Sequence, residues 1–259
     1  MNRPATFRRI FAAVFLALCL SIALPVHAEQ VNVAAASDLN FAIKEIIQQF
    51  ERDTGNQVRF TLGSSGNFYG QIVNGAPFDV FLSADLNYAK QIEKAGYAAP
   101  GSTLIYGVGR IALWVRKNSL IKPDQVGMKA LLEPSVKKIA IANPEHAPYG
   151  RVAVAAMKNA QVYDSVKQKL VLGENISQAA QFVQSGAADI GIIALSIAIS
   201  EPMQRTGVFW VIPQDSYPRL EQGAVLLKRG GAGAKAFFEW LRGASARSTF
   251  AKYGFGGEF

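Results

Sequence analysis

The chain has 259 residues, of which 50% are hydrophobic and 18% are charged, and its formal net charge at pH 7 is +8. This length provides one large domain or two small lobes with a substantial core. No dense run of Lys and Arg is interleaved with aromatic residues, so the charge pattern is not that of a nucleic-acid-binding protein.

The N-terminal segment has the three parts of a secretory signal peptide. Arg3, Arg8 and Arg9 precede an apolar run at residues 10–24, which is shorter than a membrane-spanning helix, and a small-x-small pattern ends at Ala28. We expect cleavage after Ala28 and a mature protein in the periplasm. An uncleaved anchor is less consistent with the polar residues and the strand pattern that follow at once.

Removal of residues 1–28 changes the chemistry of the chain. It leaves 231 residues and lowers the formal charge from +8 to +5, because three arginines and no acid are lost. Cys19 and His27 are also lost, so we expect no disulfide, thiol nucleophile or cysteine metal site. A lipoprotein modified at Cys19 is disfavoured by the bulky Leu18. The single remaining histidine, His146, is expected to be a loop residue and not a metal ligand.

Apolar periodicity predicts that strands alternate with helices along the mature chain. The predicted strands are residues 30–36, 57–62, 79–83, 104–108, 111–116, 138–142, 189–194, 208–212 and 224–228. The predicted helices are residues 39–50, 68–73, 87–95, 124–132, 150–160, 162–169, 176–184, 234–242 and 245–253. This alternation indicates an α/β fold with parallel sheets covered by helices on both faces. Ligands of such sheets bind beyond the carboxyl ends of strands, where helix N-termini point.

Four segments place hydrogen-bond donors directly before a predicted helix. They are residues 34–37, 64–67, 143–150 and 174–177. Each of them alone could be an ordinary helix cap. Two lie in each half of the chain, and backbone N–H groups at helix N-termini attract anions. Together the segments therefore predict an anion held in a cleft between two lobes.

Several short sequences occur together: AAAS at 34–37, SS at 64–65, GAP at 75–77, LSAD at 82–85, PEH at 144–146 and FAKYGF at 250–255. With this set, the chain resembles periplasmic molybdate-binding proteins, the solute receptors of molybdate ABC importers. The resemblance covers nearly the whole mature chain. It implies a two-lobed periplasmic-binding fold of type II with discontinuous lobes and a hinge. The first lobe would comprise residues 29–108 plus 211–259, and the second lobe residues 109–210.

The resemblance also implies a set of oxyanion ligands. The hydroxyl groups of Ser37 and Ser65 would bind the anion from the first lobe, and the backbone N–H groups of Tyr149 and Ile176 would bind it from the second. These four residues would hold the molybdenum oxyanion without a resident cofactor.

One position departs from the pattern of the family. In many members a tyrosine hydroxyl completes the shell of donors, and Ala194 stands at that position here. Either one hydrogen bond is absent, or Tyr149, Ser196 or a water molecule supplies it.

The protonation of the anion bears on its identity. Molybdate and tungstate carry no proton at neutral pH, so their site needs donors and no carboxylate. Asp38 follows Ser37 and could accept a hydrogen bond from protonated phosphate. We expect instead that Asp38 caps the first helical turn and faces away from the anion. Sulfate also carries no proton, so only the size of the cavity could reject it.

We expect a monomeric protein that captures molybdate, and also tungstate, and delivers it to an ABC permease of the inner membrane. Receptors for sulfate, chromate or phosphate are the near alternatives, and a secreted enzyme on the same fold is a more distant one. Ser64 and Ser65 lack a Gly-x-Ser-x-Gly motif and an evident base, which argues against nucleophilic catalysis. Asp79 and Asp85 are expected to cap strand ends and not to act as an acid–base pair.

Overall fold

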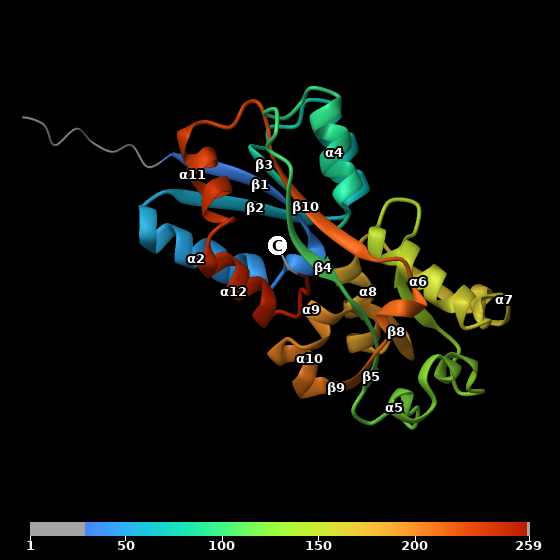
Figure 1. Cartoon of the computed structure of the whole chain (residues 1–259). Helices are drawn as coiled ribbons and strands as arrows, with labels where there is room; N and C mark the ends of the chain where they lie inside the picture. The colour runs from blue at the N-terminus through green and yellow to red at the C-terminus, as the bar shows by residue number, and fades with distance from the viewer. Residues whose placement is uncertain (1–28, 258–259) are drawn as a thin grey trace, which may run out of the picture.

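Two five-stranded sheets organise the computed structural model, which describes residues 29–257 (Figure 1). The strand order is β2-β1-β3-β10-β4 in the first sheet and β7-β6-β8-β5-β9 in the second. We call the body built on each sheet the first and the second lobe. The predicted signal peptide, residues 1–28, lies outside the described residues. Within residues 29–257, no helix has the length and hydropathy needed to cross a membrane.

The first lobe consists of segments from both ends of the described chain. Its strands are β1 (Gln30–Ala36), β2 (Gln57–Gly63), β3 (Val80–Ser83), β4 (Leu104–Gly109) and β10 (Leu220–Leu226). Its helices are α2 (Ala42–Thr54), α3 (Ser65–Val73), α4 (Leu86–Lys94), α11 (Ala232–Trp240) and α12 (Ala244–Lys252), with a 3₁₀ turn, η1 (Ser37–Leu39), after β1.

Alternating residues of the strands divide the core of the first lobe between two faces of the sheet. Val31 and Val33 of β1 belong to the cluster that contains the apolar faces of α2, α11 and α12. Ala34 belongs to the opposite cluster, together with Phe68 of α3 and Ile92 of α4. This period of two is that of a strand buried on both faces. Phe237, Phe238, Phe250 and Phe255 near the C-terminus are buried in the first of these clusters.

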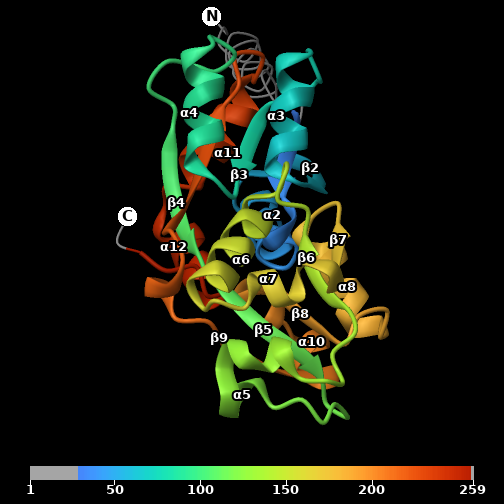
Figure 2. The same cartoon turned by 90° about the vertical axis from the view of Figure 1, so that its right-hand side faces the viewer.

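The second lobe is continuous in sequence. Its strands are β5 (Ile111–Arg116), β6 (Ile139–Ala142), β7 (Leu170–Gly173), β8 (Ile190–Ala194) and β9 (Gly207–Val211). Its helices are α5 (Pro123–Val126), α6 (Pro148–Asn159), α7 (Tyr163–Val166), α8 (Ile176–Ser185), α9 (Leu195–Ala198) and α10 (Glu201–Thr206). In the view turned by 90°, α6 of this lobe lies below α3 and α4 of the first lobe (Figure 2).

The chain passes between the lobes twice. β4 ends at Gly109 and β5 begins at Ile111, so Arg110 alone separates a strand of one sheet from a strand of the other. The return runs through residues 212–219 into β10. In Figure 1, β4 and β10 lead from the first lobe toward the second. These two connections are where a hinge between the lobes must bend.

The prediction of parallel sheets was wrong, because both sheets are mixed. β10 runs antiparallel to its neighbours β3 and β4, and β5 runs antiparallel to β8 and β9. Neighbouring strands become parallel when a helical crossover joins them. β5 and β10 instead enter their sheets directly from the connections between the lobes.

The local predictions were wrong at several starts and ends of elements. The helix expected directly after Ser37 is a 3₁₀ turn, and α2 begins only at Ala42. α3 begins at Ser65, three residues earlier than expected. β7, α9 and α10 were not predicted, because each is short and follows the preceding element within a few residues.

Candidate functional site

A small cavity lies between the two lobes. The centre of a water-sized sphere can occupy about 10 Å³ within it, so the cavity has room for about one water molecule. The first lobe lines it with Ala36, Ser37, Asp38, Gly63, Ser64, Ser65 and Ala84, and the second lobe with Ala147, Pro148, Tyr149 and Ile176. All four predicted ligand residues, Ser37, Ser65, Tyr149 and Ile176, therefore lie at one cavity.

The hydroxyl groups of Ser37 and Ser65 are held so that each can donate. The Oγ atom of Ser65 accepts a hydrogen bond from the backbone N–H of Ala84 over 2.9 Å. The Oγ atom of Ser37 accepts one from the backbone N–H of Ser177 over 3.3 Å. Both serine side chains are buried. A hydroxyl whose oxygen already accepts from an amide still has its own hydrogen for a bound acceptor.

Helix N-termini from both lobes meet at the cavity. Ser65 begins α3, Tyr149 is the second residue of α6 after Pro148, and Ile176 begins α8. Amides in the first turn of a helix have no acceptor within that helix. The positive ends of three helix dipoles therefore point toward the space that the two serines border.

The charge of the cavity wall is unusual for an anion site. No Lys or Arg is among the residues that line it, and the single ionisable carboxyl group there belongs to Asp38. The site thus offers neutral hydroxyl and amide donors and helix dipoles in place of ion pairs.

Asp38 is among the residues that line the cavity, and, contrary to the prediction, its carboxyl group does not cap the turn that follows β1. Its side chain is buried, and its Oδ2 atom accepts hydrogen bonds from the hydroxyl of Tyr149 over 3.0 Å and from Nε2 of Gln222 over 2.8 Å. Nε2 of Gln222 also lies 2.9 Å from the Tyr149 hydroxyl oxygen. Burial raises the pKa of the Asp38 carboxyl group to about 6, against the smaller lowering by these hydrogen bonds. The carboxyl group of Asp38 in the first lobe therefore makes a direct hydrogen bond with Tyr149 of the second lobe.

Ala194 lies apart from the cavity. It is the last residue of β8, it is fully buried, and it is not among the residues that line the space. The two side chains considered as substitutes for the family tyrosine are engaged elsewhere: Tyr149 donates to Asp38, and the hydroxyl of Ser196 donates to the carbonyl oxygen of Asp38 over 2.7 Å. Neither hydroxyl is therefore free to donate to an anion in this arrangement.

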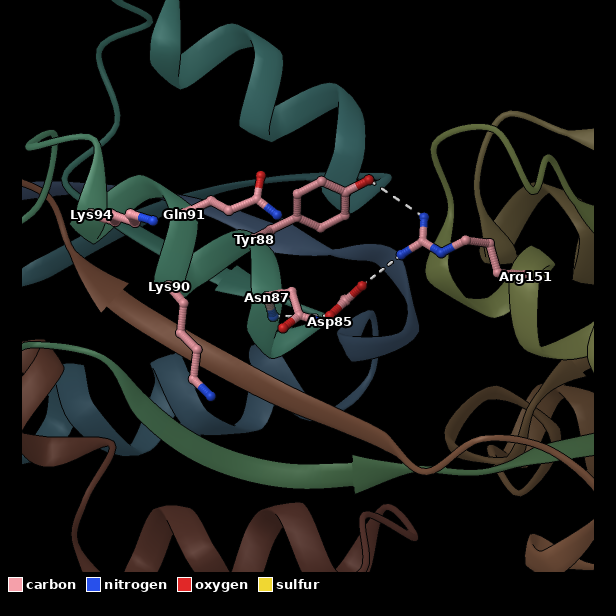
Figure 3. A pocket seen from close by; sticks show the side chains of 7 residues that line it. All are labelled: Asp85, Asn87, Tyr88, Lys90, Gln91, Lys94 and Arg151. Atoms are coloured by element: carbon pink, nitrogen blue, oxygen red, sulfur yellow. Dashed lines mark hydrogen bonds and ion pairs between the residues drawn. The ribbon is translucent and has the colours of Figure 1, made fainter.

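An ion pair connects the lobes at the rim of the cleft. Arg151 of α6 lies 2.6 Å from Oδ2 of Asp85, the N-cap residue of α4, and 3.4 Å from the hydroxyl of Tyr88. Figure 3 shows the guanidinium group of Arg151 reaching from the second lobe toward both side chains. The guanidinium carbon is also 5.6 Å from the centre of the Tyr88 ring. Asp85 is thus a cap and an interlobe partner, and it is not paired with Asp79, which bonds Asn32.

His146 also spans the two lobes. Its Nδ1 atom is 2.9 Å from the hydroxyl of Ser64, and its carbonyl oxygen accepts a hydrogen bond from Gly66 N–H over 2.9 Å. The expectation that neither Ser64 nor Ser65 has a base nearby was wrong for Ser64, because folding brings the two loops together across the cleft. Glu174 lies 3.6 Å from Nε2 of His146, but its side chain is 70% exposed. Among the residues that the structure describes, no cluster of three or more His, Cys, Asp or Glu could hold a metal ion.

Sequence reasoning missed the residues that join the lobes around the site. Gln222 carries no motif, and Ser177 was predicted only as a member of the donor segment 174–177, because only the topology brings β10 and α8 to η1. One indication of the buried carboxyl group was present in the sequence: Asp38 directly follows Ser37, and a residue next to a ligand in a turn lies near the same cavity.

The comparisons with known proteins all indicate the same kind of protein. The model described as "Bacterial extracellular solute-binding protein" matches residues 31–256. The molybdate-binding protein ModA of Rhodobacter capsulatus is 41% identical over 254 residues, which cover 97% of each chain. ModA of Azotobacter vinelandii is 38% identical over 237 residues, covering 91% of this chain and 93% of that relative.

Among solved structures, the periplasmic molybdate-binding protein of Azotobacter vinelandii matches with a TM-score of 0.82 and 32% identity, covering 88% of this chain and all of that one. The match confirms the predicted two-lobed α/β architecture. On this sequence and structural evidence, the chain belongs to the family of bacterial extracellular solute-binding proteins.

Proposed function

We propose that this protein captures molybdate, and also tungstate, between its lobes and delivers it to an ABC importer. The observation that carries the proposal is the convergence of Ser37, Ser65, Tyr149 and Ile176, two from each lobe, on one cavity without a cationic side chain. The names of the relatives, molybdate-binding proteins of two bacteria, support this choice of ion.

The donors suit a tetrahedral dianion that can only accept hydrogen bonds. Burial of such an ion is costly unless its oxygens are bonded. A hydrogen bond to a charged group contributes about 1.5–3 kcal/mol, so two hydroxyls and two amides contribute about 6–12 kcal/mol together. The helix N-termini of α3, α6 and α8 add to this stabilisation. No resident cofactor is needed for this binding.

Binding requires the lobes to move. The cavity has room for about one water molecule, so the oxyanion must enter while the lobes are apart, and the lobes must close less tightly around it. A ligand shifts this equilibrium only if it binds the closed form better than the open form. Because the donors come from both lobes, only the closed form supplies all of them.

The proposal includes the cellular setting of the protein. Residues 1–28 would be removed on export, and the mature monomer would work in the periplasm and dock on a membrane permease. The lobes would comprise residues 29–108 plus 211–259 and residues 109–210, with the hinge at the two connections. This setting agrees with a family of extracellular solute-binding proteins.

Isothermal titration calorimetry with molybdate, tungstate, sulfate, chromate and phosphate tests the choice of ligand. We expect molybdate and tungstate to bind with one site per chain and sulfate to bind much more weakly. Preferential binding of sulfate, chromate or phosphate would replace the proposed ion, and a lack of binding by all five would contradict the proposed function.

An enzymatic function is the second candidate, because of one observation. Ser64, His146 and Glu174 follow one another at 2.9 Å and 3.6 Å, in the order of a nucleophile, a base and an orienting acid. The exposed Glu174 and the small cavity make this arrangement a poor site for an ester. Hydrolysis of p-nitrophenyl acetate that disappears in Ser64→Ala would favour the enzyme, and no turnover above background would exclude this activity.

A further inference from the structure

The carboxyl group of Asp38 stands where a carboxylate is least expected. Asp38 is buried and is one of the residues that line the cavity, and no Lys or Arg lines that cavity. A bound dianion would repel an ionised carboxylate strongly in such a water-poor space. Binding of the anion therefore disfavours ionisation of Asp38, and an ionised Asp38 weakens binding of the anion.

The two oxygens of this carboxyl group differ. Oδ2 accepts from Tyr149 and from Gln222, whereas Oδ1 is buried and has no hydrogen-bond partner among residues 29–257. A buried oxygen without a partner is costly when it carries charge. A proton on Oδ1 removes the charge and turns that oxygen into a hydrogen-bond donor, like the hydroxyl groups of Ser37 and Ser65.

The groups around Asp38 provide no positive charge to offset an ionised carboxylate. The hydrogen bonds from Gln222 and Tyr149, and the nearby backbone N–H groups of residues 38 and 39, lower its pKa by less than burial raises it. Tyr149 from α6 and Tyr106 from β4 are the titratable side chains that interact with it, and the burial of both, followed by the effect of Asp38, raises their pKa well above the usual range. Gln222 from β10 and Ser196 from α9 are neutral. The sequences of α8 and α9 contain no charged residue.

We propose that Asp38 is in its acid form when the lobes are closed on the anion, with the proton on Oδ1 toward the oxyanion, so that binding takes up one proton. This inference rests on the proposed function of the cleft. In the open form Asp38 is separated from Tyr149 and Ser196 and is ionised at neutral pH. Asp38 then selects for oxyanions that carry no proton, because its acid form offers a donor and not an acceptor.

The direction of the pH dependence follows from the proton balance. The complex holds one proton more than the open protein plus the free anion, so a higher pH disfavours the complex. In the closed lobes burial already raises the pKa of Asp38 to about 6, and a neighbouring dianion raises it further. We expect the association constant for molybdate to fall by up to about tenfold per pH unit between about pH 6.5 and 8.5.

Calorimetry of molybdate binding in buffers of different ionisation enthalpy measures the proton uptake directly. Near pH 7 we expect uptake that approaches one proton per anion for the wild type and none for Asp38→Asn, which keeps a donor and binds with an affinity independent of pH. His146 is the other side chain beside the cavity that can take up a proton, so His146→Gln is the matched variant and should keep the uptake.

Several results would overturn the inference. They are molybdate binding by the wild type without proton uptake, and uptake that persists in Asp38→Asn or disappears in His146→Gln. If Asp38→Asn does not fold, the wild type and His146→Gln still decide the matter. Molybdate binding without proton uptake contradicts only this inference, whereas the absence of molybdate binding contradicts the proposed function itself.

Discussion

Ser177 of the second lobe donates two hydrogen bonds to Ser37 of the first. Its backbone N–H donates to Oγ of Ser37 over 3.3 Å, and its hydroxyl donates to the carbonyl oxygen of Ser37 over 2.8 Å. The same contact orients the Ser37 hydroxyl and joins the lobes. Closure of the lobes therefore also orients the Ser37 hydroxyl for the anion.

Ser177→Ala removes the hydroxyl bond and keeps the backbone bond. Since a hydrogen bond contributes about 0.5–1.5 kcal/mol, we expect molybdate affinity to fall by about two- to tenfold in calorimetry. Ser185→Ala is the matched control, because Ser185 is exposed on the same helix and its hydroxyl bonds the Phe182 carbonyl. Equal affinities for both variants would show that the contact between the lobes does not stabilise the closed form.

Gly66→Ala is expected to block closure. A Cβ atom at Gly66 would lie 2.6 Å from the carbonyl oxygen of His146 in the opposite lobe, where backbone must shift to make room. We expect molybdate affinity to fall by more than tenfold, and thermal unfolding of the ligand-free protein to change little. Gly70→Ala in the same helix is the control, since no atom lies within 4 Å of its Cβ position. Wild-type affinity in Gly66→Ala would mean that the lobes bind the anion without approaching this closely.

Arg151→Gln removes the ion pair with Asp85 at the rim. The pair is partly exposed, so we expect a loss of affinity of about two- to fivefold at low salt that shrinks as ionic strength rises. Stopped-flow measurement of molybdate release should show that the off-rate rises and accounts for the loss of affinity. Arg205→Gln, which removes an exposed pair with Glu201 within the second lobe, should have no effect. A loss of affinity that does not depend on ionic strength would show that the Arg151–Asp85 ion pair does not hold the lobes together electrostatically.

Ala194→Tyr is expected to destabilise the protein without tightening binding. Ala194 is fully buried and lies outside the wall of the cavity, so a large side chain there overpacks the core at a cost of about 1–3 kcal/mol. Thermal unfolding measures this loss, and Ala187→Tyr at an exposed position of the same lobe is the control. A variant that folds normally and binds molybdate more tightly would place residue 194 at the anion after all.

The sequence was sufficient to predict the elements whose apolar pattern is strong. β1 and β5 have the predicted bounds. α2 was predicted as a helix but extends to Thr54, where Gly55 caps it with a φ of 73° that suits a glycine. The direction of β10 could not be predicted, because it depends on the chain returning from the second lobe and not on the residues of the strand. The 3₁₀ turn after Ser37 was also missed, because Ser and Asp fit the start of any helical turn.

The candidate site was predictable in part for a similar reason. The local sequence predicted four donor segments before helices, and the resemblance to the family singled out Ser37, Ser65, Tyr149 and Ile176 within them. The network around Asp38 depends on Gln222, which is 184 residues away, and no local pattern reports a contact of that range. The pairing of Ser64 with His146 likewise appears only when the lobes meet.

Whether Ser37 and Ser65 hold the anion is best measured by calorimetric titration of molybdate into the wild type, Ser37→Ala and Ser65→Ala at one pH and ionic strength. Each serine would lose a charge-assisted hydrogen bond to the anion, so we expect each variant to bind roughly tenfold more weakly or worse. Thermal unfolding of the ligand-free variants separates this loss from misfolding. Wild-type affinity in both variants would contradict the account, because the anion would then be held without the two hydroxyls that border the cavity.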